Sequence, residues 1–372
     1  MLAVIVLNWN GGDDTKRCLE SLAASTLPHR VYLVDNGSTD GSLETLTADV
    51  VIRNGRNLGF AGGCNVGAKQ ALADGATHLF FLNNDATLAA DTLEKLHAAL
   101  TDDVVAVSPR IGSLPASLPR LTSLPPAPSL PLKPDFVGGK GGGVRGGGTP
   151  PPRSSAPPLL PRNAEPEGEG VGQSEERAEA GGSAQESALP LWFERGQLTL
   201  HEFVIARHVT GPGPTDFCSG CALLVRATDF ERVGGFDEAL FAYYEDIDLC
   251  LKLNGKCLVV PDAPAWHKGS ASTGGSESPR SLFYTFRNSR TVALRHGSAE
   301  QKQQYTRTWL RQGLWLASFV GGRSRDAGAA ALLGMLCARL KPSGELPPFP
   351  LWLLWPLAIL NQKLPRRDRM AI

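Results

Sequence analysis

The chain has 372 residues and a hydrophobic content of 42%, enough for one large or two ordinary domains with a buried core. Its 37 Lys and Arg residues balance its 37 Asp and Glu residues, so the overall charge gives no reason to expect a nucleic-acid partner. Seven cysteines, of which only Cys218 and Cys221 are closely spaced, exclude a disulfide framework and fit a reducing cytoplasm.

Apolar runs alternate with helical segments over the first 111 residues. Buried strands are expected at 2–7, 31–34, 50–52, 79–82 and 104–107, and helices after 13, after 42, up to about 75 and over 91–100. Strands that alternate with helices pair in parallel through right-handed crossovers, so the pattern predicts an open α/β sheet. No basic segment or cleavage site precedes the first strand, so we expect no signal peptide.

Polar side chains follow the ends of three of these strands. Asn8 and Asn10 follow the first strand, Asp35 and Asn36 the second, and Asn83, Asn84 and Asp85 the fourth. Ligands of open α/β sheets bind beyond the carboxyl ends of the strands, where these side chains would gather. Carboxylate and amide oxygens suit Mg²⁺ or Mn²⁺, which usually accompany phosphates. The pattern favours a nucleotide site, although residues 83–85 taken alone are more often a polar turn.

Glycine and cysteine spacings exclude several other sites. The glycines after these strands lack the G-x-G-x-x-G spacing of dinucleotide dehydrogenases, and the chain has no P-loop sequence. Cys218 and Cys221 match C-x-x-C, but no second pair or nearby histidine cluster completes a zinc site. We therefore interpret these two cysteines as structural.

Residues 112–189 differ sharply in composition from their surroundings. Leu-Pro repeats are followed by the glycine run 138–143, by three prolines and by a stretch rich in Ala, Glu and Gly. A segment without apolar periodicity has little to bury, so we predict a disordered insertion. Such a long structureless segment is unusual inside a domain, and a local sequence artefact is the alternative interpretation.

Ordered structure is expected again from residue 190. The sequence predicts strands within 191–209, at 217–225 and at 258–260, a helix over 228–233, a polar loop over 265–272 and a helix after 279. Glu245, Asp246 and Asp248 begin a further helix. First-turn acids complement a helix dipole, but this cluster is denser than that role needs. We favour catalysis for Asp246 and a structural role for Asp248.

The C-terminal residues 301–372 are expected to be helical. Two apolar stretches, 309–320 and 349–360, are flanked by Arg or Lys. Each is shorter than the ~20 residues needed to cross a bilayer. Trp- and Leu-rich helices with basic neighbours suit a membrane interface, and packing against the core as a subdomain is the alternative.

Seven motifs together resemble the family 2 glycosyltransferases of the GT-A fold. They are VIVLNWNG (4–11), VDNGSTDG (34–41), NLGFAGG (57–63), LNND (82–85), GGFDE (234–238), YEDIDL (244–249) and HKGS (267–270). They are most similar to the bacterial rhamnosyltransferase-like branch, over residues 1–111 and about 190–300. The resemblance implies a Rossmann-like open mixed sheet, mostly parallel. Residues 1–111 would bind the nucleotide sugar, and residues 190–300 would form the acceptor and catalytic half.

The same resemblance implies a reaction. A nucleoside-diphosphate sugar, with dTDP-rhamnose as the expectation for the branch, would donate its sugar to a hydroxyl of a glycan or lipid-linked acceptor. Transfer would be inverting, would use Mg²⁺ or Mn²⁺, and would serve polysaccharide biosynthesis of the cell envelope. The expected location is the cytoplasm, either free or peripheral on the inner face of the cell membrane.

The resemblance also implies roles for single residues. Asp35 resembles the carboxylate that holds the base, and Asp85 the last acid of the D-x-D motif. Asp246 resembles the general base, with Glu245 orienting it. The implied nucleotide-sugar ligands are Asn8, Asn10, Asp35, Asn36, Gly59, Asn84 and Asp85, and the implied metal ligands are Asp85 and His267. Asn83 stands where a strict D-x-D has its first acid, so one charged ligand is missing.

Simpler roles and other functions compete with this assignment. Asp35 could serve an Asx turn, and His267 could be an ordinary surface histidine. A sugar-phosphate nucleotidyltransferase would share the sheet and the metal, but its Gly-rich basic signature after the first strand is missing here. A catalytically inactive nucleotide- or carbohydrate-binding protein is the alternative from another class.

Overall fold

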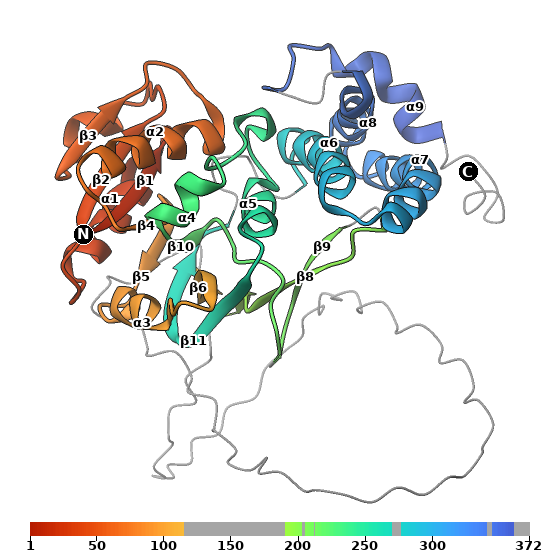
Figure 1. Ribbon diagram of the computed structural model, residues 1–372. Helices are drawn as coiled ribbons and strands as arrows, with labels where there is room; N and C mark the ends of the chain where they lie inside the picture. The colour runs from red at the N-terminus through yellow and green to blue at the C-terminus, as the bar shows by residue number, and fades with distance from the viewer. Residues whose placement is uncertain (115–189, 203–204, 212, 270–276, 341–343, 361–372) are drawn as a thin grey trace, which may run out of the picture. The chain divides into compact units, whose positions relative to one another are not determined.

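A mixed sheet of nine strands forms the centre of the residues that the structure describes (Figure 1). The structure is a computed structural model describing residues 1–114, 190–202, 205–211, 213–269, 277–340 and 344–360. The strand order is β3-β2-β1-β4-β10-β6-β11-β5, and β7 pairs with β6. The strands are β1 (Leu2–Asn8), β2 (Arg30–Asp35), β3 (Val50–Arg53), β4 (His78–Asn83), β5 (Ala86–Leu88), β6 (Val104–Ser113), β7 (Leu191–Phe193), β10 (Ala222–Arg226) and β11 (Lys256–His267). Apart from residues 112–114, the predicted disordered insertion lies outside the described residues.

The first half of the sheet is parallel, as predicted. β1 pairs in parallel with β2 and β4, and β2 pairs in parallel with β3. Residues 3–6 of β1 have no exposed surface, which is why this strand is a continuous apolar run. The connections contain α1 (Gly12–Ala23), η1 (Ser42–Thr45), α2 (Gly59–Ala73) and α3 (Thr92–Ala99). The parallel register places Asn8 beside Asp35 at the carboxyl edge.

Helix α2 packs closely on the sheet because its inner face consists of small residues. A Cβ atom on Gly63 would lie 2.3 Å from Cδ1 of Leu7, and one on Gly67 would lie 2.7 Å from Cγ2 of Ile5. Larger side chains at these positions would push the helix away from the sheet. The close approach lets the first turn of α2 reach the strand ends, where the carbonyl of Gly59 accepts a hydrogen bond from Asn36.

The second half of the sheet departs from the simple parallel pattern. β10 runs antiparallel between β4 and β6, and β11 is parallel to β6 and antiparallel to β5. β10 begins at Ala222, so the strand predicted over 217–225 starts too early. The polar loop predicted over 265–272 is wrong for residues 265–267, because β11 continues to His267 through pairing with β5 and β6.

The remaining elements lie between β7 and the C-terminus. β8 (Arg195–Leu198) and β9 (Ala206–Val209) form a separate two-stranded sheet. α4 (Ala227–Arg232), η3 (Glu238–Leu240) and α5 (Glu245–Leu253) follow β10. α6 (Pro279–His296) and α7 (Ala299–Gly321) both pack on α8 (Arg325–Leu340), which also contacts η5 (Leu351–Leu354) and α9 (Trp355–Leu360). The predicted α/β class and helical C-terminal region are confirmed.

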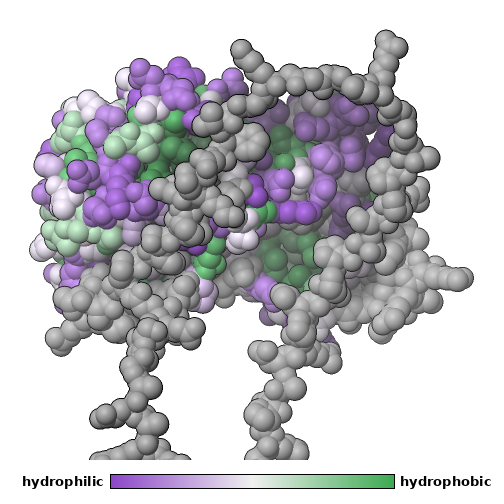
Figure 2. Space-filling model, turned by 90° about the horizontal axis from the view of Figure 1, so that it is seen from below, coloured by the Kyte–Doolittle hydropathy of each residue, from purple (hydrophilic) through white to green (hydrophobic). Residues whose placement is uncertain are grey.

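The surface of the described residues is mixed in polarity on the face seen in Figure 2. Where grey atoms do not cover that face, hydrophilic side chains alternate with patches of hydrophobic ones. Over the described ranges, every helix is too short or too polar to cross a membrane. This agrees with the expectation that neither apolar C-terminal stretch spans a bilayer.

Candidate active site

Asn8 and Asp35 form the first part of the site, at the carboxyl ends of β1 and β2. The Nδ2 atom of Asn8 donates to Oδ1 of Asp35 over 3.2 Å and to Oγ of Ser38 over 3.0 Å. Its Oδ1 accepts from the hydroxyl of Thr15 over 2.7 Å. Because Asn8 is fully buried and both of its polar atoms have protein partners, it orients Asp35 rather than facing a ligand.

Asp35 forms the Asx turn that the sequence analysis gave as the alternative to base binding. Its carboxylate accepts hydrogen bonds from the backbone N–H groups of Gly37 and Ser38, which is the Asx turn. Asn10 braces the same loop from the other side, because its Oδ1 accepts from the N–H of Thr39 over 2.8 Å. Asn10 is exposed and has a left-handed backbone, with φ of 53°. The loop is therefore held by the first two strand ends together.

Asn36 connects this loop to the start of α2. Its Nδ2 donates to Oδ1 of Asn57 over 2.9 Å and to the carbonyl of Gly59 over 3.0 Å. Its Oδ1 accepts from Asn54 and from the N–H of Leu58, both over 3.1 Å. The motifs 34–41 and 57–63 thus form one hydrogen-bonded unit, and Gly59 belongs to it through its backbone.

Asp85 and His267 form the second part of the site. Asp85 follows β4, His267 ends β11, and His267 Nε2 lies 2.9 Å from Oδ1 of Asp85. Both side chains are buried. Burial lowers the pKa of His267, but Cys221 and Asp85 outweigh it and raise the pKa to about 10. Burial also raises the pKa of the Cys221 thiol, so Asp85 is the anion that stabilises the imidazolium.

These two side chains fit a divalent metal as part of its ligand set. Carboxylate and imidazole are both ligands of Mn²⁺, and Nδ1 of His267 is buried without a hydrogen-bond partner. Among the described residues, however, no group of three or more His, Cys, Asp or Glu side chains could hold a metal. The remaining ligands would have to come from the diphosphate and water. Asn84 is turned away from Asp85 and His267, because its Nδ2 donates to the hydroxyl oxygen of Thr15 over 2.8 Å.

The acidic cluster at the start of α5 forms the third part. Oδ2 of Asp246 accepts from the N–H of Gly220 and Oδ1 from that of Ile247, each over 2.8 Å. Burial raises the pKa of Asp246, and these N–H groups limit the rise. Glu245 is buried, its Oε2 has no hydrogen-bond partner, and burial together with Asp246 raises its pKa to about 8. Burial thus favours the protonated form of Glu245, whereas the two backbone N–H groups favour the charged form of Asp246.

Asp248 has the structural role expected for it. Its Oδ1 lies 2.7 Å from both Arg295 Nη1 and His296 Nε2, and its Oδ2 lies 3.3 Å from Lys252 Nζ. Burial would raise the pKa of Asp248, but these three partners hold it below its ordinary value. The side chain is fully buried and joins α5 to the end of α6.

The segment before β10 brings the second and third parts together. Because β10 is antiparallel to β4, residues 219–221 meet the carboxyl end of β4, where the N–H of Asn83 donates to the carbonyl of Cys221 over 2.8 Å. The N–H of Gly220, the residue before Cys221, donates to Oδ2 of Asp246. Asp85, two positions beyond Asn83, and Asp246 are far apart in sequence, and both are thus brought near one short segment. This arrangement can place a base near the groups that would bind an anionic leaving group.

Comparison with known proteins assigns this arrangement to a family. Residues 3–129 match the model of "Glycosyl transferase family 2". The chain therefore contains a family 2 glycosyltransferase domain. It is 26% identical over 288 residues to "N-acetylglucosaminyl-diphospho-decaprenol L-rhamnosyltransferase" of Mycobacterium tuberculosis, covering 74% of this chain and 78% of that protein. It is 50% identical over 52 residues to "Rhamnosyltransferase WbbL" of Escherichia coli K12, covering 14% of this chain and only 20% of that relative.

The solved structures that align with this chain have low sequence identity to it and low TM-scores. The S. aureus TarS fragment 1-349 has 16% sequence identity and a TM-score of 0.46, covering 91% of this chain and 80% of that one. GalNAc-T7 with UDP, GalNAc and Mn2+ has 14% identity and a TM-score of 0.47, covering 82% and 53%. At these scores the likeness carries no functional information. The resemblance to rhamnosyltransferase-like family 2 enzymes is confirmed by the sequence relatives.

Several residues of this family 2 glycosyltransferase site were not predicted from the sequence. Trp192 packs edge-to-face on His267, with ring centroids 4.4 Å apart, and on His208 at 5.3 Å. Gly220 and Cys221 belong to the C-x-x-C motif, which was interpreted only as structural. The sequence offered one indication, which is that this motif lies at the start of a buried strand. The motif could be assigned to the site only once the direction of that strand was known.

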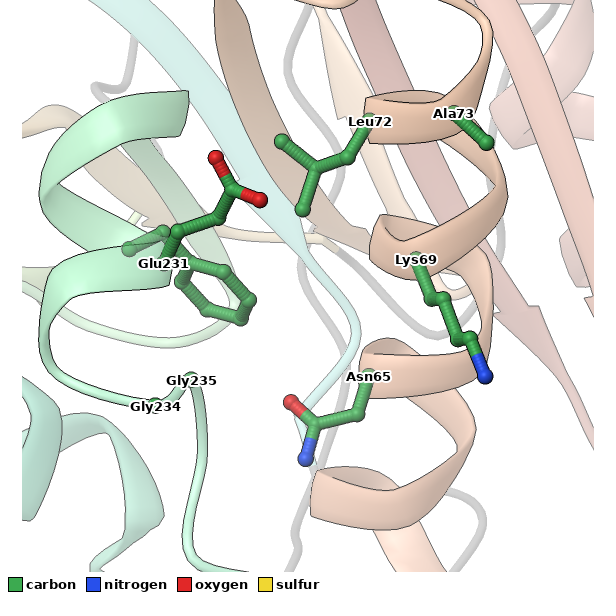
Figure 3. Close-up of a pocket in the computed structure, with 8 residues that line it drawn as sticks. Asn65, Lys69, Leu72, Ala73, Glu231, Gly234 and Gly235 are labelled. Atoms are coloured by element: carbon green, nitrogen blue, oxygen red, sulfur yellow. The ribbon is translucent and has the colours of Figure 1, made fainter.

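A cavity of about 490 Å³ lies away from this site, between α2 and α4 (Figure 3). It is lined by Asn65, Lys69, Leu72, Ala73, Phe230, Glu231, Gly234 and Gly235. Leu72 and Glu231 point toward each other across it, and the amino group of Lys69 points away. None of the predicted site residues lines this cavity, so it is separate from the strand-end site.

Proposed function

We propose that this glycosyltransferase moves a sugar from a nucleoside diphosphate to a hydroxyl of a glycan or lipid-linked acceptor, with inversion at the sugar. The observation that carries the proposal is that residues 219–221 contact both the end of β4, which leads into Asp85, and the side chain of Asp246. The names of the two relatives favour rhamnose as the transferred sugar, for which we propose dTDP-rhamnose as donor, and the name of the mycobacterial relative favours a lipid diphosphate-linked sugar as acceptor.

Residues 1–111 are proposed to bind the donor. Asp35, presented by its Asx turn and by Asn8, would accept a hydrogen bond from the nucleotide base. Asp85 and His267 would face the diphosphate, and the neutral form of His267 would ligate a bound cation through a ring nitrogen. A bound Mg²⁺ or Mn²⁺ would supply the positive charge that stabilises the leaving diphosphate. This division of labour follows the general rule for ligands of open α/β sheets.

Residues 190–300 are proposed to bind the acceptor and to supply the base. The acceptor oxygen forms a bond to the anomeric carbon while the bond from that carbon to the diphosphate oxygen breaks. Asp246 takes the proton of the hydroxyl, and the nucleoside diphosphate leaves with the bonding electrons. Attack and departure on opposite faces of the carbon invert its configuration. Glu245, whose protonated form is favoured by burial, orients Asp246.

The C-terminal helices are proposed to contact a membrane peripherally, on the cytoplasmic face. On α7, Arg307, Arg311, Trp315 and Phe319 follow one another at intervals of four and are all exposed, so they form one stripe. Trp352, Leu353 and Leu357 are also exposed, by 49–60%. Aromatic rings flanked by arginines suit an anionic lipid surface. Sedimentation of the protein with anionic vesicles tests this proposal. The double variant Trp315→Ser/Phe319→Ser should no longer sediment with them.

Two measurements test the reaction itself. A thermal-shift panel of nucleoside diphosphates and their sugars, with and without Mn²⁺, reports donor binding, because a ligand of the folded state raises the melting temperature. Product analysis then separates the alternatives. Release of nucleoside diphosphate supports a glycosyltransferase reaction, release of pyrophosphate would indicate a nucleotidyltransferase, and binding without turnover of donor would indicate an inactive binding protein.

A further inference from the structure

The loop that precedes the acidic cluster has a strained backbone. Phe241, Tyr243 and Tyr244 have φ values of 64°, 66° and 73°, in the left-handed region that side chains other than glycine rarely adopt. Tyr244 is also the residue that caps α5, so its backbone sets the direction in which Glu245 and Asp246 leave the loop. Strain of this kind persists only where surrounding contacts enforce it.

Asn288 on α6 supplies those contacts. Its Nδ2 lies 2.9 Å from the carbonyl oxygen of Leu240, 2.8 Å from that of Ala242 and 2.7 Å from that of Tyr243. The two N–H bonds of a single amide are therefore shared among three of the carbonyls in and beside the strained loop. Asn288 has no exposed surface, so water cannot replace these bonds.

Arg287 fixes the orientation of that amide. Its Nε donates to Oδ1 of Asn288 over 2.8 Å, which directs the NH₂ group toward the loop. Its Nη2 donates to the carbonyl of Leu240 over 2.7 Å, and its Nη1 donates to the carbonyl of Gly344. Arg287 is also fully buried. The two neighbouring side chains thus act as one rigid clamp on the loop.

The loop also contacts the donor half of the site. The carbonyl of Phe241 accepts from the N–H of Ala61 over 3.2 Å, in the first turn of α2. A Cβ atom on Gly59 would lie only 2.4 Å from that same carbonyl oxygen. The loop is therefore packed between the motif 57–63, proposed to bind the donor, and the clamp on α6.

We propose that Asn288, oriented by Arg287, is a positioning residue that sets Asp246 against the donor by holding residues 241–244 in their left-handed conformation. The proposal rests on the proposed function of Asp246 and adds a role for α6. Without the clamp the loop can relax toward unstrained backbone, and the start of α5 would turn with it. Displacements of about 1 Å at a reacting group can cost ~10²-fold in rate.

The test compares Asn288→Ala with Ser289→Ala. Ser289 is the next residue of α6 and equally buried, but it contacts Tyr305 over 3.4 Å instead of the loop. The readouts are the melting temperature, donor affinity, kcat, acceptor KM, and hydrogen–deuterium exchange of residues 238–250. For Asn288→Ala we expect faster exchange in this segment and kcat lowered roughly 10- to 100-fold, with donor affinity and acceptor KM unchanged. Ser289→Ala should change only the melting temperature.

A rescue variant separates positioning from general loss of structure. Glycine adopts positive φ without strain, so Tyr244→Gly lowers the need for a clamp. Asn288→Ala should therefore lower kcat less in the Tyr244→Gly background than in the wild-type background. If Asn288→Ala does not fold, the same cycle is measured with Asn288→Ser, which keeps one donor.

The outcomes decide separately about the clamp and about the proposed function. Unchanged exchange over 238–250 and unchanged kcat in a folded Asn288 variant would overturn the inference, as would equal losses with and without Tyr244→Gly. If the wild-type enzyme turned over no donor, the proposed function would fail instead. The exchange data would still decide whether Asn288 holds the loop.

Discussion

The backbone N–H of Gly220 donates to Oδ2 of Asp246 over 2.8 Å, across 26 positions of the sequence. This bond connects the segment beside β4 to the first turn of α5. The approach is close, because a Cβ atom on Gly220 would lie 3.1 Å from Cβ of Asp246, so a larger residue there would have to shift that side chain slightly. The carboxylate is thus placed by backbone from the neighbouring strand rather than by its own helix alone, and the first prediction depends on this.

Asp246→Asn should lower transfer by roughly 10²–10⁴, the range typical for loss of acid–base catalysis, while donor affinity and melting temperature stay close to wild type. The amide keeps the shape of the side chain, and its oxygen can still accept from Gly220. Asp248→Asn is the control with the opposite pattern. It weakens the contacts to Arg295 and His296, so it should lower the melting temperature and leave transfer per folded molecule largely intact. Wild-type transfer rates in Asp246→Asn would refute the base assignment.

Glu245→Gln should stabilise the protein increasingly as the pH rises. The pKa of Glu245 is raised in the folded state to about 8, so the folded protein binds this proton more tightly than the unfolded chain does. Wild-type stability from this group is therefore complete below about pH 4.5 and is lost as the pH rises through 8. Melting temperatures of both proteins between pH 5 and 9 should diverge toward high pH. Parallel curves would mean that Glu245 titrates normally.

Asp85→Ala should weaken metal-dependent donor binding, because it removes the carboxylate that lies beside His267 just after β4. Titrating Mn²⁺ against donor binding measures the effect directly. Asp74→Ala, which removes an exposed acid that pairs with Arg30 beyond the end of α2, is the matched control and should leave the titration unchanged. An unchanged metal dependence in Asp85→Ala would move the metal site elsewhere.

Gly59→Ala should destabilise the protein more than Gly75→Ala. Both glycines have positive φ, 77° and 86°, so each substitution costs about 1–2 kcal/mol in backbone conformation. Only at Gly59 does the new Cβ meet a backbone atom, the carbonyl oxygen of Phe241 at 2.4 Å, whereas at Gly75 no atom lies within 4 Å. Denaturant unfolding of the two variants measures the difference. Equal losses of unfolding free energy in the two variants would show that residues 241–244 can shift to accommodate the new Cβ atom at no cost.

Replacing residues 115–188 with a short Gly/Ser linker should leave the sheet intact. The ends of the replaced segment lie together, because the N–H of Ser113 donates to the carbonyl of Pro190 over 2.6 Å. The loop-closure entropy is therefore small for a short linker. Circular dichroism and thermal melting should show cooperative unfolding as in the full chain. Collapse of both signals would place the segment in the core, and intact folding without transfer would give it an acceptor role.

The sequence by itself was enough to identify the strands of the first half and the residues at their ends. Asp35 and Asp85 were predicted at the carboxyl edge because buried parallel strands are continuous apolar runs with abrupt polar ends, and that pattern is local. The motifs were also specific enough to indicate the family, as the match over residues 3–129 confirms. The acidic cluster at 245–248 could also be identified from local sequence, because it holds more acids than a helix dipole needs.

What only the tertiary structure decided was which of these pieces meet. The antiparallel direction of β10 brings Gly220 to Asp246, and the extension of β11 makes His267 a buried partner of Asp85 instead of part of a loop. The left-handed backbone of Phe241, Tyr243 and Tyr244 was also invisible, because no glycine marks it and the bonds from Asn288 enforce it. Local periodicity reports burial along one element, whereas strand direction and enforced strain depend on contacts between residues far apart in the chain.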